Sequence, residues 1–168
     1  LEFRRVLFRS RKNDAFITRD NPHHLWYASH GYISVRVDIR GTGDSQGLYF
    51  DEYTEQEQKD MCELVAWLAD QPWCNGKVGM TGESWGGFMG LITAFNQPPA
   101  LKTVITVYST DDRYATDVKF NGGCVLGCEL LTWEALFLAL NATPPSPKYI
   151  ANWKDLWLER LKKQTTPW

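Results

Sequence analysis

The chain has 168 residues, 43% of them hydrophobic and 23% charged, with a formal net charge of −2. This length suits one domain with a hydrophobic core, since a chain of this size buries roughly 70% of its unfolded surface. The weak net charge argues against nucleic acid or an anionic membrane as partner, and no apolar run approaches the roughly 20 residues of a membrane span, so we expect a soluble, cytoplasmic protein that acts on small molecules or peptides.

The first ten residues, "LEFRRVLFRS", are identical to the codon-by-codon translation of a widely used sequencing-library adapter. Translated scars of this kind are set aside in reasoning about a fold. We therefore expect residues 1–10 to be adapter-derived and non-native, with the natural sequence beginning near Arg11.

The segment "YISVRVDI", from Tyr32 to Ile39, alternates apolar and polar residues and is predicted to be a strand. The glycine-rich loop "RGTGDSQG" follows it. In this loop Gly47 comes one residue too late for the dinucleotide-binding pattern G-x-G-x-x-G, and loop-like sequence follows where a helix should open. The sequence therefore predicts no cofactor.

An amphipathic helix that covers a sheet is expected next. Thr54 and Glu57 form a capping box at its start, and Pro72 stops it. Between these positions, apolar residues recur at helical spacing at Met61, Leu64, Val65 and Leu68.

Two further strands with a helix between them follow the turn "PWCNGK". The stretch "VGMTG" is predicted to be a buried strand, "SWGGFMGLITAFN" a helix and "LKTVITVYS" the next strand. Alternating strands and helices imply right-handed crossovers and a parallel sheet, so the predicted class is a three-layer α/β fold. Ligands of such folds bind beyond the carboxyl ends of the strands, where Ser84 lies.

The pattern becomes helical after "STDDRY". The stretches "GGCVLGCELLTWEALFLAL" and "NWKDLWLERLKK" are predicted to be helices on either side of the proline-rich loop "ATPPSPKY". We therefore divide the chain into a partial core, residues 11–112, and the start of a helical cap, residues 113–168. Aromatic residues make up 14% of the chain, which suits a pocket lining or a packed cap.

The four cysteines, Cys62, Cys74, Cys124 and Cys128, lack the spacing of a zinc ribbon and the density of a disulfide scaffold. Cys124 and Cys128 would share a helix face, but two ligands make no metal site. We expect reduced, buried thiols and no metal.

The sequence "GESWG" at positions 82–86 matches G-x-S-x-G, the pattern of a nucleophile on a sharp strand-to-helix turn. The turn brings backbone close together two residues either side of the serine, so side chains at Gly82 and Gly86 would clash. Ser84 is the predicted nucleophile. The backbone N–H of Trp85, at the start of the helix, is the predicted donor to the oxyanion, and the Trp85 indole is a candidate wall of the acyl pocket.

A serine nucleophile needs a base, usually a histidine oriented by a carboxylate. The three histidines, His23, His24 and His30, precede Ser84, whereas on this architecture the order is serine, acid, histidine. We interpret them as polar residues of loops or strand edges. Asp111 and Asp112 are a candidate acid position, although "STDDRY" fits a turn into the cap equally well.

Four stretches, "GYISVRVDIRGTGDSQG", "WLADQPWCNGKVGMTGESWGGF", "PPALKTVITVYSTDDRY" and "NGGC", resemble the cocaine-esterase and X-Pro dipeptidyl-peptidase family of serine hydrolases. The similarity covers nearly everything from Arg11 to Trp168. It implies an incomplete α/β-hydrolase core with a helical cap, followed by the acid, the histidine and a jelly-roll domain. It also implies cleavage of an ester, amide or peptide substrate without a cofactor.

In this family a tyrosine hydroxyl supplies the second oxyanion donor, and the resemblance implies that tyrosine at the position of Ser10. Because this is the last residue of the adapter-like segment, we expect the intact gene to encode tyrosine there. We expect the chain by itself to be inactive, since it lacks the base, the acid and this donor.

Two other interpretations remain open. A binding protein with a hydrolase fold would have lost the acid and histidine, so the reading frame downstream of Trp168 distinguishes it. A prolyl-oligopeptidase-like peptidase shares the elbow sequence and would have a β-propeller upstream, although "QPWCNGKVGM" argues against it.

Overall fold

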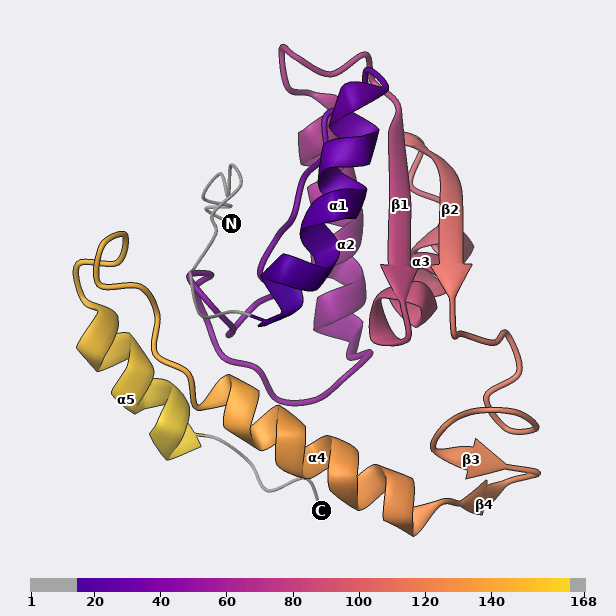
Figure 1. Cartoon of the computed structure of the whole chain (residues 1–168), viewed down its shortest axis with the longest axis vertical. Coiled ribbons are helices and arrows are strands. Elements are labelled where there is room, and N and C mark those ends of the chain that lie inside the picture. The colour runs from indigo at the N-terminus through magenta and orange to yellow at the C-terminus, as the bar shows by residue number, and fades with distance from the viewer. Residues whose placement is uncertain (1–14, 164–168) are drawn as a thin grey trace.

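The computed structural model describes residues 15–163 of the chain, including the side chains of residues 22–139 and 142–163 (Figure 1). Its helices and strands are, in chain order, α1 (Ala15–Ser29), α2 (Glu55–Ala69), β1 (Val78–Glu83), α3 (Trp85–Phe95), β2 (Leu101–Val107), β3 (Phe120–Asn121), β4 (Cys124–Val125), α4 (Gly127–Asn141) and α5 (Trp153–Lys163). No helix in this part of the chain combines the length and apolar character needed to cross a membrane.

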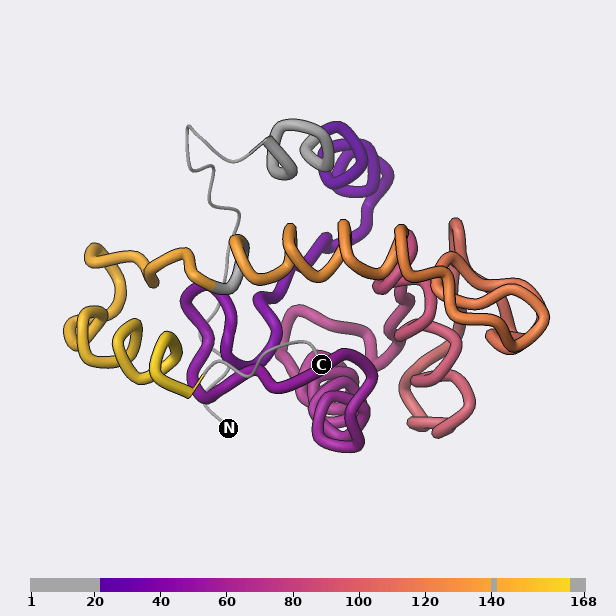
Figure 2. The backbone as a smooth tube through the Cα atoms, turned by 90° about the horizontal axis from the view of Figure 1, so that it is seen from below, coloured from indigo at the N-terminus to yellow at the C-terminus, as the bar shows by residue number. Residues whose placement is uncertain are grey.

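The centre of the fold is a strand–helix–strand unit. β1 and β2 pair in parallel, with Met80 opposite Val104 and Glu83 opposite Val107, and α3 connects them and packs against both. α2 packs mainly on α3 and touches β1. In Figure 2, α1 lies on one side of the molecule, and α2 and α3 lie on the opposite side. The predicted α/β class with a parallel sheet is therefore confirmed.

Small residues let α3 lie close to β2. A Cβ at Gly87 would stand 2.8 Å from the Ser109 Oγ and 3.1 Å from the Val107 carbonyl oxygen. A Cβ at Gly90 would only reach ordinary contact with Thr106, at 3.6 Å. The close approach therefore occurs in the first turn of α3, next to Ser84.

α2 begins and ends close to the predicted positions. The Glu57 N–H donates to the Thr54 Oγ1 at 3.2 Å, as in a capping box. The Glu57 carboxylate accepts at 2.6 Å from the N–H of Tyr53, one residue earlier than the usual partner. Leu64 and Val65 are buried on the inner face of the helix.

The prediction of a strand over residues 32–39 is wrong. These residues form no regular element, and Ile33 and Val35 are 57% and 38% exposed. A strand forms only where a neighbour completes its hydrogen bonds, and in the described part of the chain β1 pairs only with β2. The sequence pattern also did not reveal α1, which contains Pro22.

The segment predicted to start the cap, residues 113–168, contains the β3–β4 hairpin, α4 and α5. The helix predicted from residue 122 begins instead at Gly127, because Gly122 and Gly123 have φ of 55° and 79° and turn the chain between β3 and β4. α5 lies where it was predicted. In Figure 1, α4 runs past the end of the molecule toward which β1 and β2 point.

Arg160 of α5 joins the cap to the glycine-rich loop after residue 39. Its buried guanidinium donates to the carbonyl oxygens of Gly43, at 2.9 Å, and Ser45. Burial lowers the pKa of Arg160, while Asp38 and Asp44 act in the opposite direction. Asp44 also accepts a hydrogen bond from the Ser146 N–H at 2.7 Å. The glycine-rich loop therefore contacts both α5 and the segment that precedes it.

The four cysteines are free. Cys62 and Cys74 are half-buried, but Cys124 and Cys128 are exposed, so the expectation of buried thiols is wrong for this second pair. Among the described residues, no three His, Cys, Asp or Glu side chains are grouped to hold a metal ion.

Candidate active site

Ser84 occupies the turn between β1 and α3 in an unusual backbone conformation. Its φ is 51° and its ψ is −115°, a region that costs a non-glycine residue about 1–3 kcal/mol. The Ser84 N–H donates to the Val107 carbonyl at 2.8 Å, and the Ser84 carbonyl accepts from the Phe88 N–H at 2.9 Å. β2 and the first turn of α3 therefore hold the strained residue from both sides.

The two glycines that flank the serine differ in their steric requirements. A Cβ at Gly82 would stand 2.4 Å from the carbonyl carbon of Gly86 and 2.8 Å from its Cα, closer than atoms can approach. A Cβ at Gly86 would meet nothing within 4 Å. The expected clash is therefore confirmed at Gly82 and wrong at Gly86.

Trp85 is the first residue of α3 and lies at the positive end of its dipole. N–H groups in the first turn of a helix have no acceptor within the helix, so they can bind an anion. The Ser84 side chain makes no capping hydrogen bond to this turn. The Ser84 hydroxyl and the backbone N–H groups of the first turn therefore lie at the same end of α3.

The Trp85 indole is packed among aromatic rings from three segments. The Trp85 ring centroid lies 4.9 Å from that of Phe137 on α4, 5.7 Å from that of Tyr49 and 6.3 Å from that of Tyr53. Phe137 also contacts the rings of Tyr49 and Trp133, at 5.0 and 5.7 Å. Together these rings form an aromatic cluster through which α4 packs against the turn at Ser84. The aromatic cluster consists of Tyr49, Tyr53, Trp85, Trp133 and Phe137.

Phe137→Ala should loosen the cap. Phe137 is 8% exposed, and truncation of a buried phenylalanine costs about 3–5 kcal/mol. Urea unfolding followed by tryptophan fluorescence should show this loss. Leu136→Ala, at a neighbouring position that is 43% exposed, serves as the control and should change the unfolding free energy by less than about 1 kcal/mol. Equal losses in the two variants would contradict the role of the cluster.

Glu57 is a buried carboxyl group next to this cluster. Burial raises its pKa to about 7, and the negative charges of Glu52 and Asp60 act in the same direction. The Tyr53 N–H and the Trp85 indole act to lower the pKa. Nevertheless, the Trp85 Nε1 has no hydrogen-bond partner among the described residues, so the Glu57 carboxyl group and the Trp85 indole form no regular hydrogen bond.

The Glu57 carboxyl should make folding stability fall as pH rises. Its pKa in the folded protein is higher than the ordinary 4.5, so the stabilisation is complete below pH 4.5 and is lost as pH rises through about 7. The full change corresponds to about 3 kcal/mol. Unfolding free energies measured from pH 4.5 to 8.5 should therefore decline more steeply for the wild type than for Glu57→Gln. Parallel curves would contradict this.

One ion pair and one cation–π contact join the segment after β2 to the rest of the site. Lys119 pairs with the buried carboxylate of Glu52, which also accepts from the Trp133 Nε1 at 2.6 Å. Arg113 pairs with Asp117 at 2.7 Å, and its guanidinium lies 4.4 Å from the centre of the Tyr53 ring. These contacts bring α4 and the residues after β2 against the start of α2.

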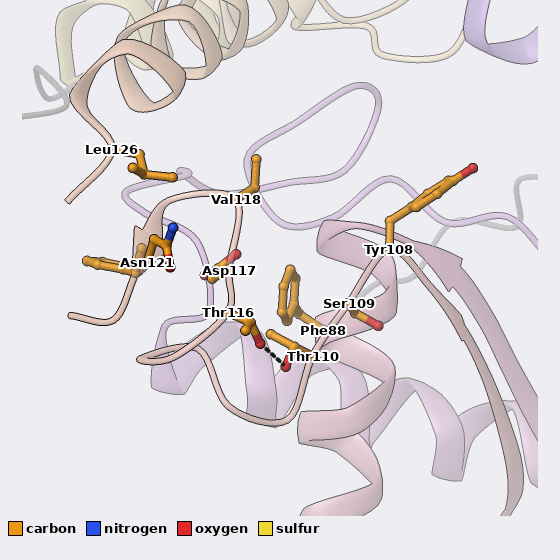
Figure 3. A pocket seen from close by; sticks show the side chains of 10 residues that line it. Phe88, Tyr108, Ser109, Thr110, Thr116, Asp117, Val118, Asn121 and Leu126 are labelled. Atoms are coloured by element: carbon orange, nitrogen blue, oxygen red, sulfur yellow. Dashed lines mark hydrogen bonds between the residues drawn. The ribbon is translucent and has the colours of Figure 1, made fainter. Parts of the chain in front are cut away.

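A pocket of about 410 Å³ lies beyond the carboxyl end of β2 (Figure 3). Its lining includes Phe88 and the polar residues Ser109, Thr110, Thr116 and Asp117. Thr110 and Thr116 hydrogen-bond each other at 3.3 Å. The Asp117 side chain is fully buried, and its Oδ1 has no partner among the described residues. The Trp85 indole is not part of this lining.

The histidines lie on α1 or directly after it. His23 and His24 are on α1 rather than in loops or at strand edges, which corrects the prediction. The His24 Nδ1 lies 2.5 Å from the Ser34 Oγ, and His30 stacks on the Trp26 ring with centroids 4.1 Å apart. These contacts are local to α1 and the residues after it.

The aspartates after β2 form a turn. The Asp112 Oδ1 accepts from the N–H groups of Tyr114 and Ala115, at 3.1 and 3.0 Å. Asp111 and Asp112 are exposed. The geometry therefore favours the turn over the acid. Ser10, the position at which the resemblance implies a tyrosine, lies outside the described residues.

A parallel strand pair joined by a helix, with a positive-φ serine at the strand-to-helix turn, is typical of the α/β-hydrolase fold. Comparison of sequences agrees: the profile of the X-Pro dipeptidyl-peptidase family (S15 family) matches residues 6–168. The chain belongs to this family. The match begins inside the adapter-like segment, five residues before Arg11.

Named relatives are similar over most of the chain. A Mycobacterium bovis protein named for serine esterase activity is 36% identical over 117 residues, which are 70% of this chain. The cocaine esterase of a Rhodococcus species is 30% identical over 112 residues, or 67% of this chain. The matched regions are only 18% and 19% of these two relatives, so the chain spans about a fifth of their length.

Proposed function

We propose that the complete protein containing this chain, called the parent enzyme below, is a serine hydrolase that cleaves esters or amides through an acyl-enzyme. Ser84 is the nucleophile, and the Trp85 N–H donates to the oxyanion. The observation that carries the proposal is the φ of 51° at Ser84, held between β2 and α3. A strained backbone conformation that is maintained by the surrounding structure is typical of functional sites.

In the first half of the reaction the Ser84 Oγ attacks the carbonyl carbon of the substrate while a base takes the hydroxyl proton. The Trp85 N–H stabilises the negative oxygen of the tetrahedral intermediate. The intermediate then collapses, the bond to the leaving alcohol or amine breaks, and the leaving group takes up the proton. Water then attacks the acyl-enzyme in the same way and restores the Ser84 hydroxyl.

We expect the base and the acid from elsewhere in the parent enzyme, because His23 lies on α1, His24 and His30 make local contacts there, and the Asp112 carboxylate holds a turn. We therefore expect the 168-residue chain alone to be inactive. The reading frame of the parent enzyme should contain an acid and then a histidine downstream of Trp168, and a tyrosine at the position of Ser10.

The pocket beyond β2 is a suitable place for one side of the substrate. Its walls are tied to Ser84, because the Phe88 N–H binds the Ser84 carbonyl and Ser109 comes two residues after Val107, which accepts from the Ser84 N–H. A lining that combines an aromatic ring with hydroxyl groups suits a small substrate with both kinds of surface.

The test is active-site labelling of the parent enzyme with a fluorophosphonate, followed by peptide mapping, together with assays on p-nitrophenyl esters and on Xaa-Pro anilides. Modification of Ser84 is the expected result, and the ratio of the two rates assigns the ester or amide preference. Modification at another serine would overturn the assignment. A protein with no label, no turnover and no downstream histidine would be a binding protein with this fold.

A further inference from the structure

We propose that Arg113 determines which substrate groups fit the pocket beyond β2, because its side chain connects the two parts of the pocket lining. Arg113 is not itself a lining residue. It contacts one lining residue from each part, so it is a positioning residue and not a catalytic one. This inference rests on the proposed function, which places one side of the substrate in this pocket.

The lining of the pocket comes from two elements. Phe88 belongs to α3, and the other lining residues belong to the segment 108–126, which follows β2 (Figure 3). Phe88 is buried, and its N–H donates to the Ser84 carbonyl at 2.9 Å, so its place is tied to the serine turn. The segment after β2 is held by backbone hydrogen bonds within itself, such as that from the Asp117 N–H to the Phe120 carbonyl at 2.9 Å. Side-chain contacts must therefore fix this segment relative to α3.

The guanidinium of Arg113 contacts the α3 part of the lining through an aromatic ring. The Arg113 Cζ lies over the Phe88 ring, 4.6 Å from its centre, and over the Tyr53 ring, 4.4 Å from its centre. The two rings meet edge to face, with centroids 5.8 Å apart. A planar guanidinium at this distance is attracted by the face of a ring and stacks on it. Arg113 therefore holds the Phe88 ring in place next to Tyr53.

The same guanidinium contacts the other part of the lining through an ion pair. The Arg113 Nε donates to the Asp117 Oδ2 at 2.7 Å. The Asp117 side chain is fully buried, and a buried carboxylate that loses its counter-charge is strongly destabilised. Thr116 and Val118, on either side of Asp117 in the chain, also line the pocket. The position of this part of the lining therefore depends on Arg113.

These contacts make Arg113 a rigid connection between Phe88 and Asp117. A hydrophobic site that accepts or rejects one methylene group changes kcat/KM by about 10–200-fold, so small movements of a lining have large effects on specificity. Without the stacked guanidinium, the two parts of the lining should separate more easily and admit larger groups. The chemistry at Ser84 should change less than the discrimination between substrates.

The test compares the parent enzyme with its Arg113→Lys variant. Lysine keeps a positive charge for Asp117 but lacks the planar group that stacks on the two rings. The substrates are p-nitrophenyl esters with acyl chains of two to eight carbons, and acetates of alcohols of the same lengths, so that both sides of the ester are covered. In one of the two series, the ratio of kcat/KM for the eight-carbon substrate to that for the four-carbon substrate should rise about tenfold. A purely structural role would instead change the rates for all substrates by one common factor.

Lys59→Arg is the matched control. Lys59 pairs with Glu55 at 2.7 Å and with the same spacing in the chain, but both side chains are exposed and neither residue lines the pocket. The exchange of lysine and arginine at this position should leave the ratio unchanged.

A second variant keeps the test decisive if Arg113→Lys does not fold. Arg113→Met combined with Asp117→Asn removes the guanidinium and leaves no unpaired charge in the protein interior. Asparagine has nearly the size of aspartate, so the space beside the pocket is little changed. This double variant should show the same rise in the ratio, and urea unfolding of each variant shows whether it is folded under the assay conditions.

Unchanged ratios in both series for the folded variants would overturn the role of Arg113, and so would an equal rise in Lys59→Arg. Fluorophosphonate labelling separates this failure from that of the proposed function. Labelled Ser84 with unchanged ratios removes only the role of Arg113. A wild-type enzyme without label at Ser84 overturns the hydrolase mechanism, and the role of Arg113 with it.

Discussion

Ser84→Ala should reduce kcat of the parent enzyme by at least about 10⁴-fold and leave KM nearly unchanged. In the proposed mechanism the Ser84 hydroxyl supplies the atom that bonds to the substrate carbonyl, so its removal prevents formation of the acyl-enzyme. Residual turnover would come from binding and from the oxyanion donor alone. The measurement is steady-state hydrolysis of the better of the two substrate types, together with loss of fluorophosphonate labelling.

Ser29→Ala is the control for this experiment. Ser29 is exposed at the end of α1, where its hydroxyl donates to the Trp26 carbonyl at 2.8 Å. Its loss should leave kcat within about twofold of the wild type, because exposed substitutions rarely change stability by more than about 0.5 kcal/mol. A Ser84→Ala enzyme that keeps wild-type activity would show that the serine turn has a purely structural role.

Gly82→Ala should destabilise the fold by at least about 3 kcal/mol. The new methyl group would lie 2.4 Å from a backbone carbon of Gly86, and backbone on both sides of Ser84 would have to move to admit it. The hydrogen bond from the Ser84 N–H to Val107 would be lost or bent in that movement. Urea unfolding gives the stability change, and the labelling rate of Ser84 in the parent enzyme gives its effect on the turn.

Gly86→Ala is the matched control, because it makes the same chemical change at the other end of the same contact. Its methyl group would meet open space, and alanine is favoured over glycine in a helix by up to about 1 kcal/mol. We therefore expect unchanged or slightly higher stability. Similar losses in the two variants would mean that the turn needs flexibility at both glycines rather than space at one.

The sequence was sufficient for the parts of the fold that depend on local signals. The capping box at Thr54 located the start of α2, and the G-x-S-x-G pattern located the turn between β1 and α3. The expected strand over residues 32–39 failed, because alternation shows only which face of a strand would be buried. Whether a partner lies beside it is a property of the tertiary structure.

The candidate site was predictable only in part for the same reason. Ser84 and the Trp85 N–H follow from a short motif whose geometry is local. The burial of Glu57 does not, since a capping box marks the start of a helix and carries no information on what packs against it. The contacts of Phe137 with Tyr49 and Trp85 join residues far apart in the chain, so an aromatic-rich composition could only hint at them.

The contacts of Arg160 bear on how this chain unfolds. They join α5 to the glycine-rich loop across 117 and 115 residues of sequence, and the guanidinium gives up its hydration to make them. If α5 opened by itself, two carbonyl groups of the loop would lose their partner. The predicted boundary at residue 112 divides the chain into two regions by position in the sequence. Because of the Arg160 contacts, we do not expect these two regions to unfold independently. The predicted cap and core should therefore unfold in one transition. Protection of the glycine-rich loop from hydrogen exchange should depend on whether α5 is in place.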